Sequence, residues 1–182
     1  MLADKIVVYG ALAHSFFKEL GYELGESLVD KDTSLVRPFL NHPKIILPVD
    51  VRVKNGDRVF IKMPNALSAT DSILDVGLLS IEKLLPVIAD ASFILWNGPL
   101  GNFEHGFRGS TDAVAKFIVA GDSESIVGGG DTIASIRALN ILDQFDFVST
   151  GGGAMLDFLA TGTLPGIEAL KTSPIFKVSD NS

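Results

Sequence analysis

The sequence contains no cysteine among its 182 residues, which excludes disulfide bonds, thiolate metal sites and a thiol nucleophile. Basic residues are scarce: 15 lysines and arginines stand against 22 aspartates and glutamates, a formal net charge of −7. This balance argues against a nucleic-acid binder that relies on broad positive charge. No apolar run approaches the roughly 20 residues of a membrane span, and the opening residues lack the pattern of a signal peptide. We therefore expect no nucleic-acid partner, no membrane partner and no secretory leader.

Glycine is the residue that the sequence has in quantity, and its distribution is uneven. Thirteen of the 18 glycines lie in residues 85–182, and this stretch carries 11 acidic but only 5 basic residues. The length and the 47% hydrophobic content suit one globular domain. We place that single domain over residues 1–182, because no repeat, linker or low-complexity segment suggests an internal boundary.

Apolar periodicity in the N-terminal part predicts a buried strand, short helices and a hairpin. Ile6 to Val8 is typical of a short buried strand, and helical spacing from Ala11 to Leu20 ends at Gly21, the usual position after a helix. Three further elements are predicted here: a short helix over 34–40, a hairpin of 44–54 with 57–62 across Asn55-Gly56, and a helix over 79–89 that ends or kinks near Pro86.

From residue 93 onward, short apolar strands alternate with helices. We expect strands at 93–96, 125–127 and 145–148, and helices at about 112–120, from 132 to about 139, at 154–160 and at 164–170, followed by a polar, loose tail. Such alternation is typical of parallel strands covered by helices. The predicted fold class is therefore α/β: a three-layer, Rossmann-like, mostly parallel sheet with helices on both faces and a β-hairpin.

Three successive predicted strands run into loops that contain glycine: 97–104 (NGPLGNFE), 128–132 (GGGDT) and 149–153 (STGGG). In a parallel sheet these loops lie at one edge, outside the carboxyl ends of the strands, where such folds bind ligands. Glycine lets the backbone approach a ligand closely, and the N-terminus of a following helix attracts anions. The pattern predicts that an acidic protein binds phosphate through backbone N–H groups; glycines that only form tight turns are the alternative.

Two common nucleotide motifs are absent, since Asp131 stands where a P-loop lysine is needed and no G-x-G-x-x-G occurs. Instead, WNGPLGNFE at 96–104, the segment 127–132 and the segment 149–154 resemble the nucleotide-binding segments of phosphoglycerate kinase. The stretches GALAHSFFKELGYELGESLV, KIILPVDVRV and LPGIEAL resemble the same family in the expected order. The resemblance runs from about residue 2 to 170.

This resemblance implies a cytoplasmic, glycolytic transferase that moves a phosphoryl group between 1,3-bisphosphoglycerate and ADP, giving 3-phosphoglycerate and ATP, with Mg²⁺ as cofactor. The chain would correspond to most of the C-terminal, nucleotide-binding domain. Asp131 would hold Mg²⁺, and Gly151, Gly152 and Gly153 would face the phosphoryl group in transfer. The positions that would bind the nucleotide are Gly10, Asn97, Pro99, Gly101, Asn102, Glu104, Gly128, Gly129, Gly130, Asp131 and Thr132. Without the resemblance, Asp131 is equally a helix N-cap and Glu104 a solvated loop carboxylate.

The chain also departs from the family that it resembles. The family's N-terminal half, which supplies a basic patch for 3-phosphoglycerate and an arginine for the transition state, has no counterpart here, and neither does its Gly-Gly-Ala-Lys segment with an early strand. We therefore expect a sheet that lacks a member and a chain that is inactive alone, reaching 3-phosphoglycerate only through an N-terminal domain. Tyr9 replaces a usual glycine, which leaves open whether its ring crowds the adenine or points away. The alternatives are a non-catalytic nucleotide-binding module, a split subunit that needs a separate N-terminal partner, or a structural homologue that self-associates through an exposed sheet edge.

Overall fold

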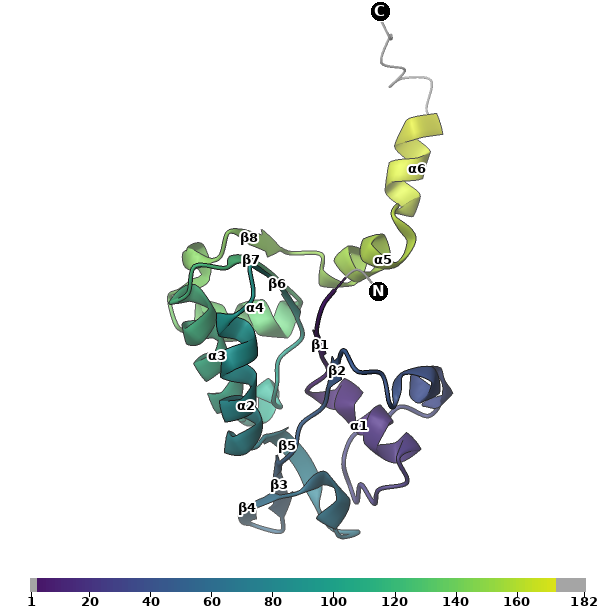
Figure 1. Cartoon of the computed structure of the whole chain (residues 1–182), viewed down its shortest axis with the longest axis vertical. Coiled ribbons are helices and arrows are strands. Elements are labelled where there is room, and N and C mark those ends of the chain that lie inside the picture. The colour runs from purple at the N-terminus through teal and green to yellow at the C-terminus, as the bar shows by residue number, and fades with distance from the viewer. Residues whose placement is uncertain (1–2, 173–182) are drawn as a thin grey trace, which may run out of the picture.

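The structure is a computed structural model that describes residues 3–172 (Figure 1). Its first elements are β1 (Ile6–Val7), α1 (Ala11–Glu19), the 3-10 helix η1 (Ser34–Phe39), β2 (Ile45–Ile46), β3 (Val51–Asn55), β4 (Arg58–Lys62), η2 (Pro64–Ala66), β5 (Ser72–Val76) and α2 (Leu78–Ala89). The chain continues with β6 (Phe93–Asn97), η3 (Phe103–His105), α3 (Gly109–Val119), β7 (Glu124–Gly128), α4 (Gly130–Arg137), η4 (Leu142–Gln144), β8 (Phe147–Ser149), α5 (Gly152–Thr161) and α6 (Pro165–Thr172). Over these residues, no helix combines the length and the apolar character that crossing a membrane requires.

The strands of the described residues form three small sheets. β1 and β2 pair in parallel, and β6, β7 and β8 form a parallel sheet in that order. The hairpin β3–β4 is extended by β5, which pairs antiparallel to β3. Beside the β6–β8 sheet, α2 packs on α3, α3 on α4, and α4 on β7 (Figure 1). The predicted α/β class, with parallel strands flanked by helices and an antiparallel hairpin, is confirmed.

Two hydrophobic cores stabilise these layers. The first lies under α1, and its most buried members include Phe16, Phe17, Val51 and Val53. The second lies between α2, α3, α4 and β7, and its members include Leu84, Val114, Ile118, Val127 and Ile136. In α1 the first core buries Ala13, Phe16 and Phe17, whereas Leu12 and Leu20 are exposed.

Tyr9 connects the two cores. Its ring packs against the second core, while its neighbour Val8 belongs to the first. The Tyr9 hydroxyl donates a hydrogen bond to the carbonyl oxygen of Ser80, 3.0 Å away. Burial, assisted by the negative charge of Asp50, raises the pKa of Tyr9 to about 12. The ring is therefore held against the start of α2.

The predicted hairpin is present, but its details differ. Asn55 pairs with Arg58, so the two-residue loop is Gly56-Asp57 and not Asn55-Gly56. Only Gly56 has a positive φ, of 57°. The predicted strand 44–54 is also divided, because Ile45–Ile46 pairs with β1 instead of continuing into β3.

Other local predictions need smaller corrections. The sequence patterns do not predict β5, and the short helix over 34–40 is a 3-10 helix that contains Pro38. Pro86 lies inside α2, which continues to Ala89. Gly21 follows α1 with a φ of 81°, as predicted.

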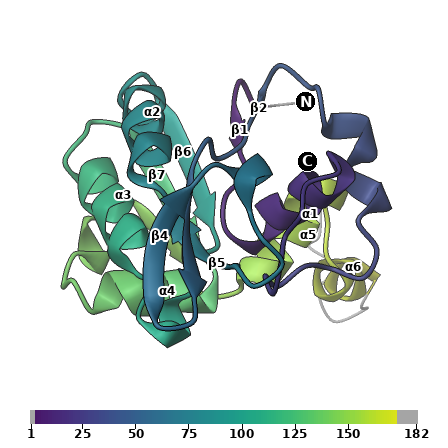
Figure 2. The ribbon, with the colours of Figure 1, turned by 90° about the horizontal axis from the view of Figure 1, so that it is seen from below.

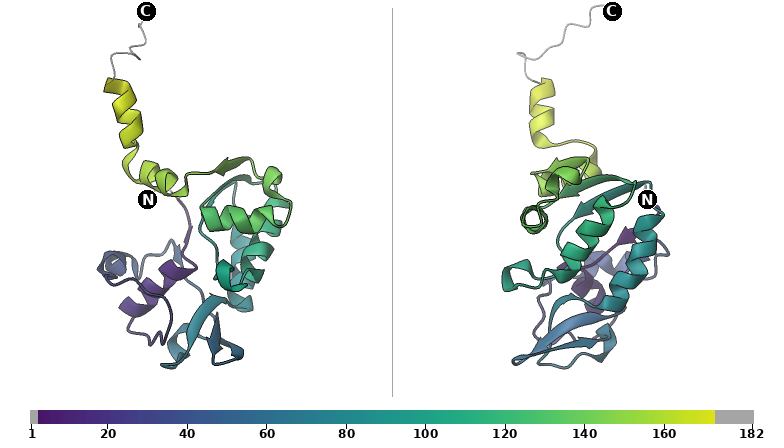
Figure 3. Two further views of the ribbon diagram at one scale, coloured as in Figure 1. Left: turned by 180° about the vertical axis from the view of Figure 1, so that it is seen from behind. Right: turned by 90° about the vertical axis from the view of Figure 1, so that its left-hand side faces the viewer.

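The helices α5 and α6 extend away from the rest of the molecule (Figures 1 and 3). Most side chains of α5 are exposed although they are largely apolar. The exposed apolar residues of the two helices are Leu156, Phe158, Leu159, Ile167 and Leu170. The predicted polar tail beyond residue 172 lies outside the described residues.

Candidate functional site

The strands β6, β7 and β8 end side by side at one edge of their sheet. The register pairs Asn97 with Gly128, and Gly128 with Ser149. Because the strands are parallel, the loops that follow them leave from the same edge. We call residues 97–99, 128–132 and 151–153 the glycine-loop edge. The structure thus brings together the loops that the sequence singles out.

The loops of the glycine-loop edge touch one another. A Cβ atom on Gly152 would lie 2.5 Å from the backbone nitrogen of Gly129. Gly129 itself has a φ of 91°, a conformation that favours glycine, and its own Cβ would lie 2.5 Å from Oδ1 of Asn97. The side-chain amide of Asn97 donates to the carbonyl oxygen of Gly152 at 3.1 Å. Asn97 therefore ties the three loops together.

Gly10 reaches the same edge from the other parallel sheet. It precedes α1 and has a φ of 64°. A Cβ atom on Gly10 would lie 2.7 Å from the carbonyl oxygen of Pro99. Two segments that are distant in sequence thus meet in backbone contact at two of the positions expected to bind the nucleotide.

The first turn of α4 presents two polar side chains that differ in exposure. Thr132 is fully buried, and its Oγ1 has no hydrogen-bond partner in the described part of the chain. A buried hydroxyl without a partner carries a desolvation cost of about 1–3 kcal/mol, which is a reason to look for a ligand. Asp131 is exposed, and it makes no capping bond because the N-cap of α4 is Gly129. The N-cap interpretation of Asp131 is therefore wrong.

The remaining site candidates make local contacts. Gly101 packs on Asp75, whose Oδ1 would lie 2.5 Å from a Cβ atom there. Oδ1 of Asn102 accepts a hydrogen bond from the backbone N–H of His105 at 3.2 Å and so caps η3. Glu104 is exposed in that helix. The carboxylate of Glu104 is therefore accessible from solvent.

Asp75 anchors this loop, and the sequence analysis does not single it out. Its carboxylate is buried in β5 and accepts hydrogen bonds from the N–H groups of Val76, at 2.9 Å, and Ser110, at 3.4 Å. Burial raises the pKa of Asp75, and these donors offset the rise only in part. The backbone N–H of Asn102 donates to the carbonyl oxygen of Leu74 at 2.7 Å. The sequence does carry a signal that could have identified Asp75: it is an acidic residue inside an apolar stretch.

The residues at the glycine-loop edge fit a partial magnesium site. Among the described residues, no group of three or more His, Asp or Glu side chains lies close enough to hold a metal. Mg²⁺ is commonly bound by one or two carboxylates together with substrate phosphates and water, not by a full protein cage. The exposed Asp131, next to the partnerless hydroxyl of Thr132, provides that kind of donor set.

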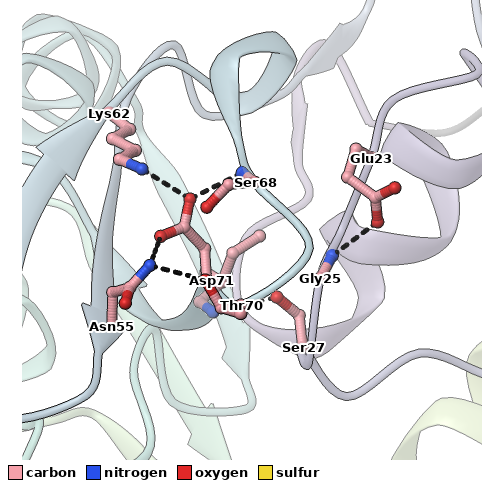
Figure 4. Close-up of polar contacts among 9 residues, drawn as sticks. Glu23, Gly25, Ser27, Asn55, Lys62, Ser68, Thr70 and Asp71 are labelled. Atoms are coloured by element: carbon pink, nitrogen blue, oxygen red, sulfur yellow. Dashed lines mark hydrogen bonds and ion pairs between the residues drawn. The ribbon is translucent and has the colours of Figure 1, made fainter.

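A second polar cluster surrounds Asp71 in the β3–β5 region (Figure 4). Asp71 accepts hydrogen bonds from Nζ of Lys62 at 2.6 Å, from Nδ2 of Asn55 at 2.9 Å and from the backbone N–H of Ser68 at 2.7 Å. Burial by itself would raise the pKa of Asp71, but these donors outweigh it and hold the pKa well below its usual range. Its carbonyl oxygen also accepts from the N–H of Glu26. This cluster is fully partnered and joins the hairpin to the preceding chain.

Comparison with known proteins assigns the family. Residues 1–162 match the sequence model of the family described as "Phosphoglycerate kinase". The chain belongs to the phosphoglycerate kinase family. The phosphoglycerate kinases of Haemophilus influenzae and Buchnera aphidicola are each 38% identical over 176 residues, covering 93% of this chain. The solved phosphoglycerate kinases of Coxiella burnetii and Pyrococcus horikoshii superpose with TM-scores of 0.83 and 0.74, at 36% and 30% identity, again over 93% of this chain.

The chain is much shorter than these phosphoglycerate kinases. The matched regions make up 46% of the Haemophilus influenzae and Coxiella burnetii chains, and 45% of the Buchnera aphidicola and Pyrococcus horikoshii chains. The family resemblance that the glycine loops indicate is therefore confirmed for a chain that spans less than half the length of its relatives.

Proposed function

We propose that this chain supplies the Mg-nucleotide half of the phosphoglycerate kinase reaction, binding ADP or ATP at the glycine-loop edge. One observation carries the proposal: loops after three parallel strands converge where Thr132 has a buried hydroxyl that no described residue partners. In this proposal, residues 1–182 form a single domain that corresponds to most of the C-terminal domain of the longer relatives. A cytoplasmic role in glycolysis is proposed with it.

Phosphoryl transfer depends mainly on positioning and on stabilising negative charge. The free N–H groups at the starts of α4 and α5 suit phosphate oxygens. Thr132 would donate its hydroxyl proton to a phosphate oxygen, and Asp131 would hold the metal ion. Mg²⁺, when bound, neutralises charge on the phosphates. Gly151, Gly152 and Gly153 would face the transferred group.

The nucleoside would lie beside the loop after β6. Gly10 and Pro99, which are in backbone contact, would border it together with Asn97. The exposed carboxylate of Glu104 would accept hydrogen bonds from the ribose hydroxyls, and Asn102 would line the same side. These roles follow the family resemblance, and the positions of the loops support them.

We further propose that the chain alone does not turn over. None of the proposed site residues is a lysine or arginine, so none of them would supply a cation to balance the transition-state charge. Arg108 is engaged with Asp112 at 2.8 Å and with the carbonyl oxygen of Ser135. The groups that bind 3-phosphoglycerate would have to come from an N-terminal domain.

Calorimetric titration with MgADP tests the nucleotide proposal. We expect saturable binding to the chain and at least about tenfold weaker binding, or about 1.4 kcal/mol, for Asp131→Ala. Asp122→Ala is the matched control, because Asp122 is also exposed but precedes β7 at the opposite edge of the sheet. Absence of binding, or equal affinity in the two variants, would contradict the proposal.

A coupled assay tests the second claim. With 1,3-bisphosphoglycerate and MgADP, the purified chain should form ATP no faster than the uncatalysed background. Substantial ATP formation by the chain alone would show that it carries its own substrate site.

A split subunit or a non-catalytic nucleotide-binding module is the second candidate function for a chain that matches 46% of the length of two of its relatives. A split subunit would co-purify with a separate N-terminal partner and gain kinase activity in that complex. Light scattering of the free chain addresses the remaining interpretation: self-association without MgADP binding would indicate a purely structural homologue.

A further inference from the structure

Arg108 is the N-cap residue of α3, and its side chain contacts residues of three elements. Its Nε donates to Oδ2 of Asp112, one turn further along α3, at 2.8 Å. Its Nη2 donates to the carbonyl oxygen of Ser135 in α4 at 3.2 Å. Its guanidinium carbon lies 5.6 Å from the centre of the Phe103 ring in η3. One side chain therefore joins η3, α3 and α4.

Asp112 and Ser135 complete the connection between α3 and α4, which pack against each other (Figures 1 and 2). The Ser135 hydroxyl is fully buried and donates to Oδ1 of Asp112 at 3.1 Å. The last four carbonyl groups of a helix lack a partner within the helix, and Arg108 supplies a donor for the one at Ser135. We call the set of Phe103, Arg108, Asp112 and Ser135 the guanidinium bridge.

The two ends of the guanidinium bridge lie in the two parts of the proposed nucleotide site. Phe103 immediately precedes Glu104, whose carboxylate is proposed to accept the ribose hydroxyls. At the other end, Ser135 lies about one helical turn beyond Asp131 and Thr132 on α4. The bridge therefore sets the spacing between the ribose side and the phosphate side of the site.

A simpler interpretation is that Arg108 only contributes positive charge near the phosphates. The ion pair argues against it, because Nε of Arg108 and Oδ2 of Asp112 are 2.8 Å apart and two such opposite charges leave little net field at a distance. A planar guanidinium serves two acceptors and an aromatic face at once, whereas the ammonium group of lysine acts as a single point charge. The three partners of Arg108 therefore require the shape of arginine as well as its charge.

We propose that Arg108 is a positioning residue, which holds the ribose side and the phosphate side of the site at the spacing of one nucleoside diphosphate. This inference rests on the proposed function of the glycine-loop edge. Arg108 acts through η3 and α4 and does not contact the ligand. Two linked groups bind together only where the geometry lets both engage. A ligand that spans both sides therefore depends on the guanidinium bridge, whereas a ligand of the phosphate side alone does not.

Calorimetric titration with two ligands tests this difference. MgADP spans both sides, and magnesium pyrophosphate occupies the phosphate side alone. For Arg108→Ala we expect MgADP affinity to fall at least tenfold and pyrophosphate affinity to change less than twofold. Arg137→Ala is the matched control, because it removes the same charge from an exposed arginine in the last turn of α4. Unchanged MgADP affinity in Arg108→Ala, equal weakening of both ligands, or an equal effect of the control overturns the proposal.

Two milder variants separate the connection from charge and from loss of folding. Arg108→Lys keeps the charge but not the planar group, so MgADP affinity should still fall at least threefold; an affinity equal to that of the wild type contradicts the inference. Phe103→Leu removes the ring contact and leaves the hydrogen bonds of Arg108 to α3 and α4. It should weaken MgADP about threefold and pyrophosphate less than twofold, and equal weakening of the two ligands again counts against the bridge.

Hydrogen exchange on the ligand-free chain measures the connection without any nucleotide. In Arg108→Ala, the amides of η3 and of α4 should both exchange at least threefold faster, while those of β3, in another sheet, keep their rates. Faster exchange in only one of the two elements overturns the inference. A wild-type chain that does not bind MgADP overturns the proposed function and the role of the spacing together. Binding by the wild type with failed variants overturns only the inference.

Discussion

The carboxylates of Asp71 and Asp131 lie in two regions of the molecule that provide opposite environments. Asp71 is 0% exposed and has donors from a lysine, an amide side chain and a backbone N–H. Asp131 is exposed without a capping bond, and its neighbour Thr132 buries a hydroxyl that has no partner among the described residues. Buried polar groups are normally satisfied. The Asp71 cluster therefore stabilises the fold, whereas the glycine-loop edge leaves the Thr132 hydroxyl without a partner among the described residues.

The largest expected effect on stability tests the partnered region. Asp71→Ala removes the acceptor for Lys62, Asn55 and the Ser68 N–H. Breaking a buried ion pair from one side costs about 3–5 kcal/mol, and because Lys62 can turn toward solvent we expect about 3 kcal/mol lost from the free energy of unfolding. Denaturant unfolding followed by circular dichroism measures this loss.

Asp57→Ala is the control for this variant, because Asp57 is exposed on the same hairpin; it should change stability by less than about 0.5 kcal/mol. The pKa of Asp71 is lowered in the folded chain, so its contribution is present above the unfolded pKa of about 3.9 and is lost as the pH falls toward the folded pKa. The stability difference between wild type and Asp71→Ala should therefore shrink in acid. An equal effect of the two substitutions at pH 7 would contradict the comparison.

Gly152→Ala tests the close contact within the glycine-loop edge. Its new Cβ would lie 2.5 Å from the nitrogen and 2.7 Å from Cα of Gly129, and backbone atoms cannot move aside cheaply. Overpacking of this kind costs about 1–3 kcal/mol, so we expect about 2 kcal/mol lower stability, measured by the same unfolding experiment. The same displacement should abolish MgADP binding in calorimetry.

Gly153→Ala is the matched control for Gly152→Ala. A Cβ atom at Gly153 meets nothing within 4 Å, and the residue lies in α5 without a positive φ. Alanine is about 0.8–1.0 kcal/mol better than glycine in a helix, so this variant should be slightly more stable. Equal destabilisation by both substitutions would show that the loops are not packed as described.

Thr132→Val gives the smallest expected change in stability. The direction of that change distinguishes the glycine-loop edge from the Asp71 cluster. The substitution removes a buried hydroxyl that has no partner in the described part of the chain, so we expect stability to rise by about 1 kcal/mol. MgADP affinity should fall about tenfold, because the proposed donor to phosphate is lost. Thermal unfolding and calorimetry on the same preparation measure both quantities.

Thr111→Val is the corresponding control, since Oγ1 of Thr111 is buried but accepts the N–H of Leu100 at 3.0 Å. It should be destabilised by about 1–3 kcal/mol because that N–H is left without an acceptor. If Thr132→Val also destabilises the chain, the Thr132 hydroxyl has a structural partner and not a ligand role.

Local signals predict much of the fold. The end of α1 at Gly21 and the strands β6 and β7 follow from side-chain periodicity and glycine position, which act within a few residues. β5 is different, because its apolar pattern is interrupted by Asp75, whose donors include the N–H of Ser110, 35 residues further along the chain. Tertiary partners of this kind override strand propensity.

The same limit applies to the hairpin and to the candidate site. Asn55-Gly56 is a strong local turn signal, but Nδ2 of Asn55 bonds Asp71 and the strand extends by one residue. The position of the glycine triplets at one edge of the sheet is predictable, because each triplet follows a predicted parallel strand in the sequence. The absence of a hydrogen-bond partner for the Thr132 hydroxyl among the described residues is not predictable from the sequence, because it depends on the positions of all the surrounding side chains.

Trp96 has one further consequence for experiments. It is the sole tryptophan of the sequence, and its indole N–H donates to the carbonyl oxygen of Gly98 at 2.8 Å. Any shift of Gly98 changes the environment of the indole, and with it the wavelength and yield of its emission. The chain thus carries an unlabelled optical reporter inside the loop proposed to receive the nucleotide, with no second indole to mask its signal.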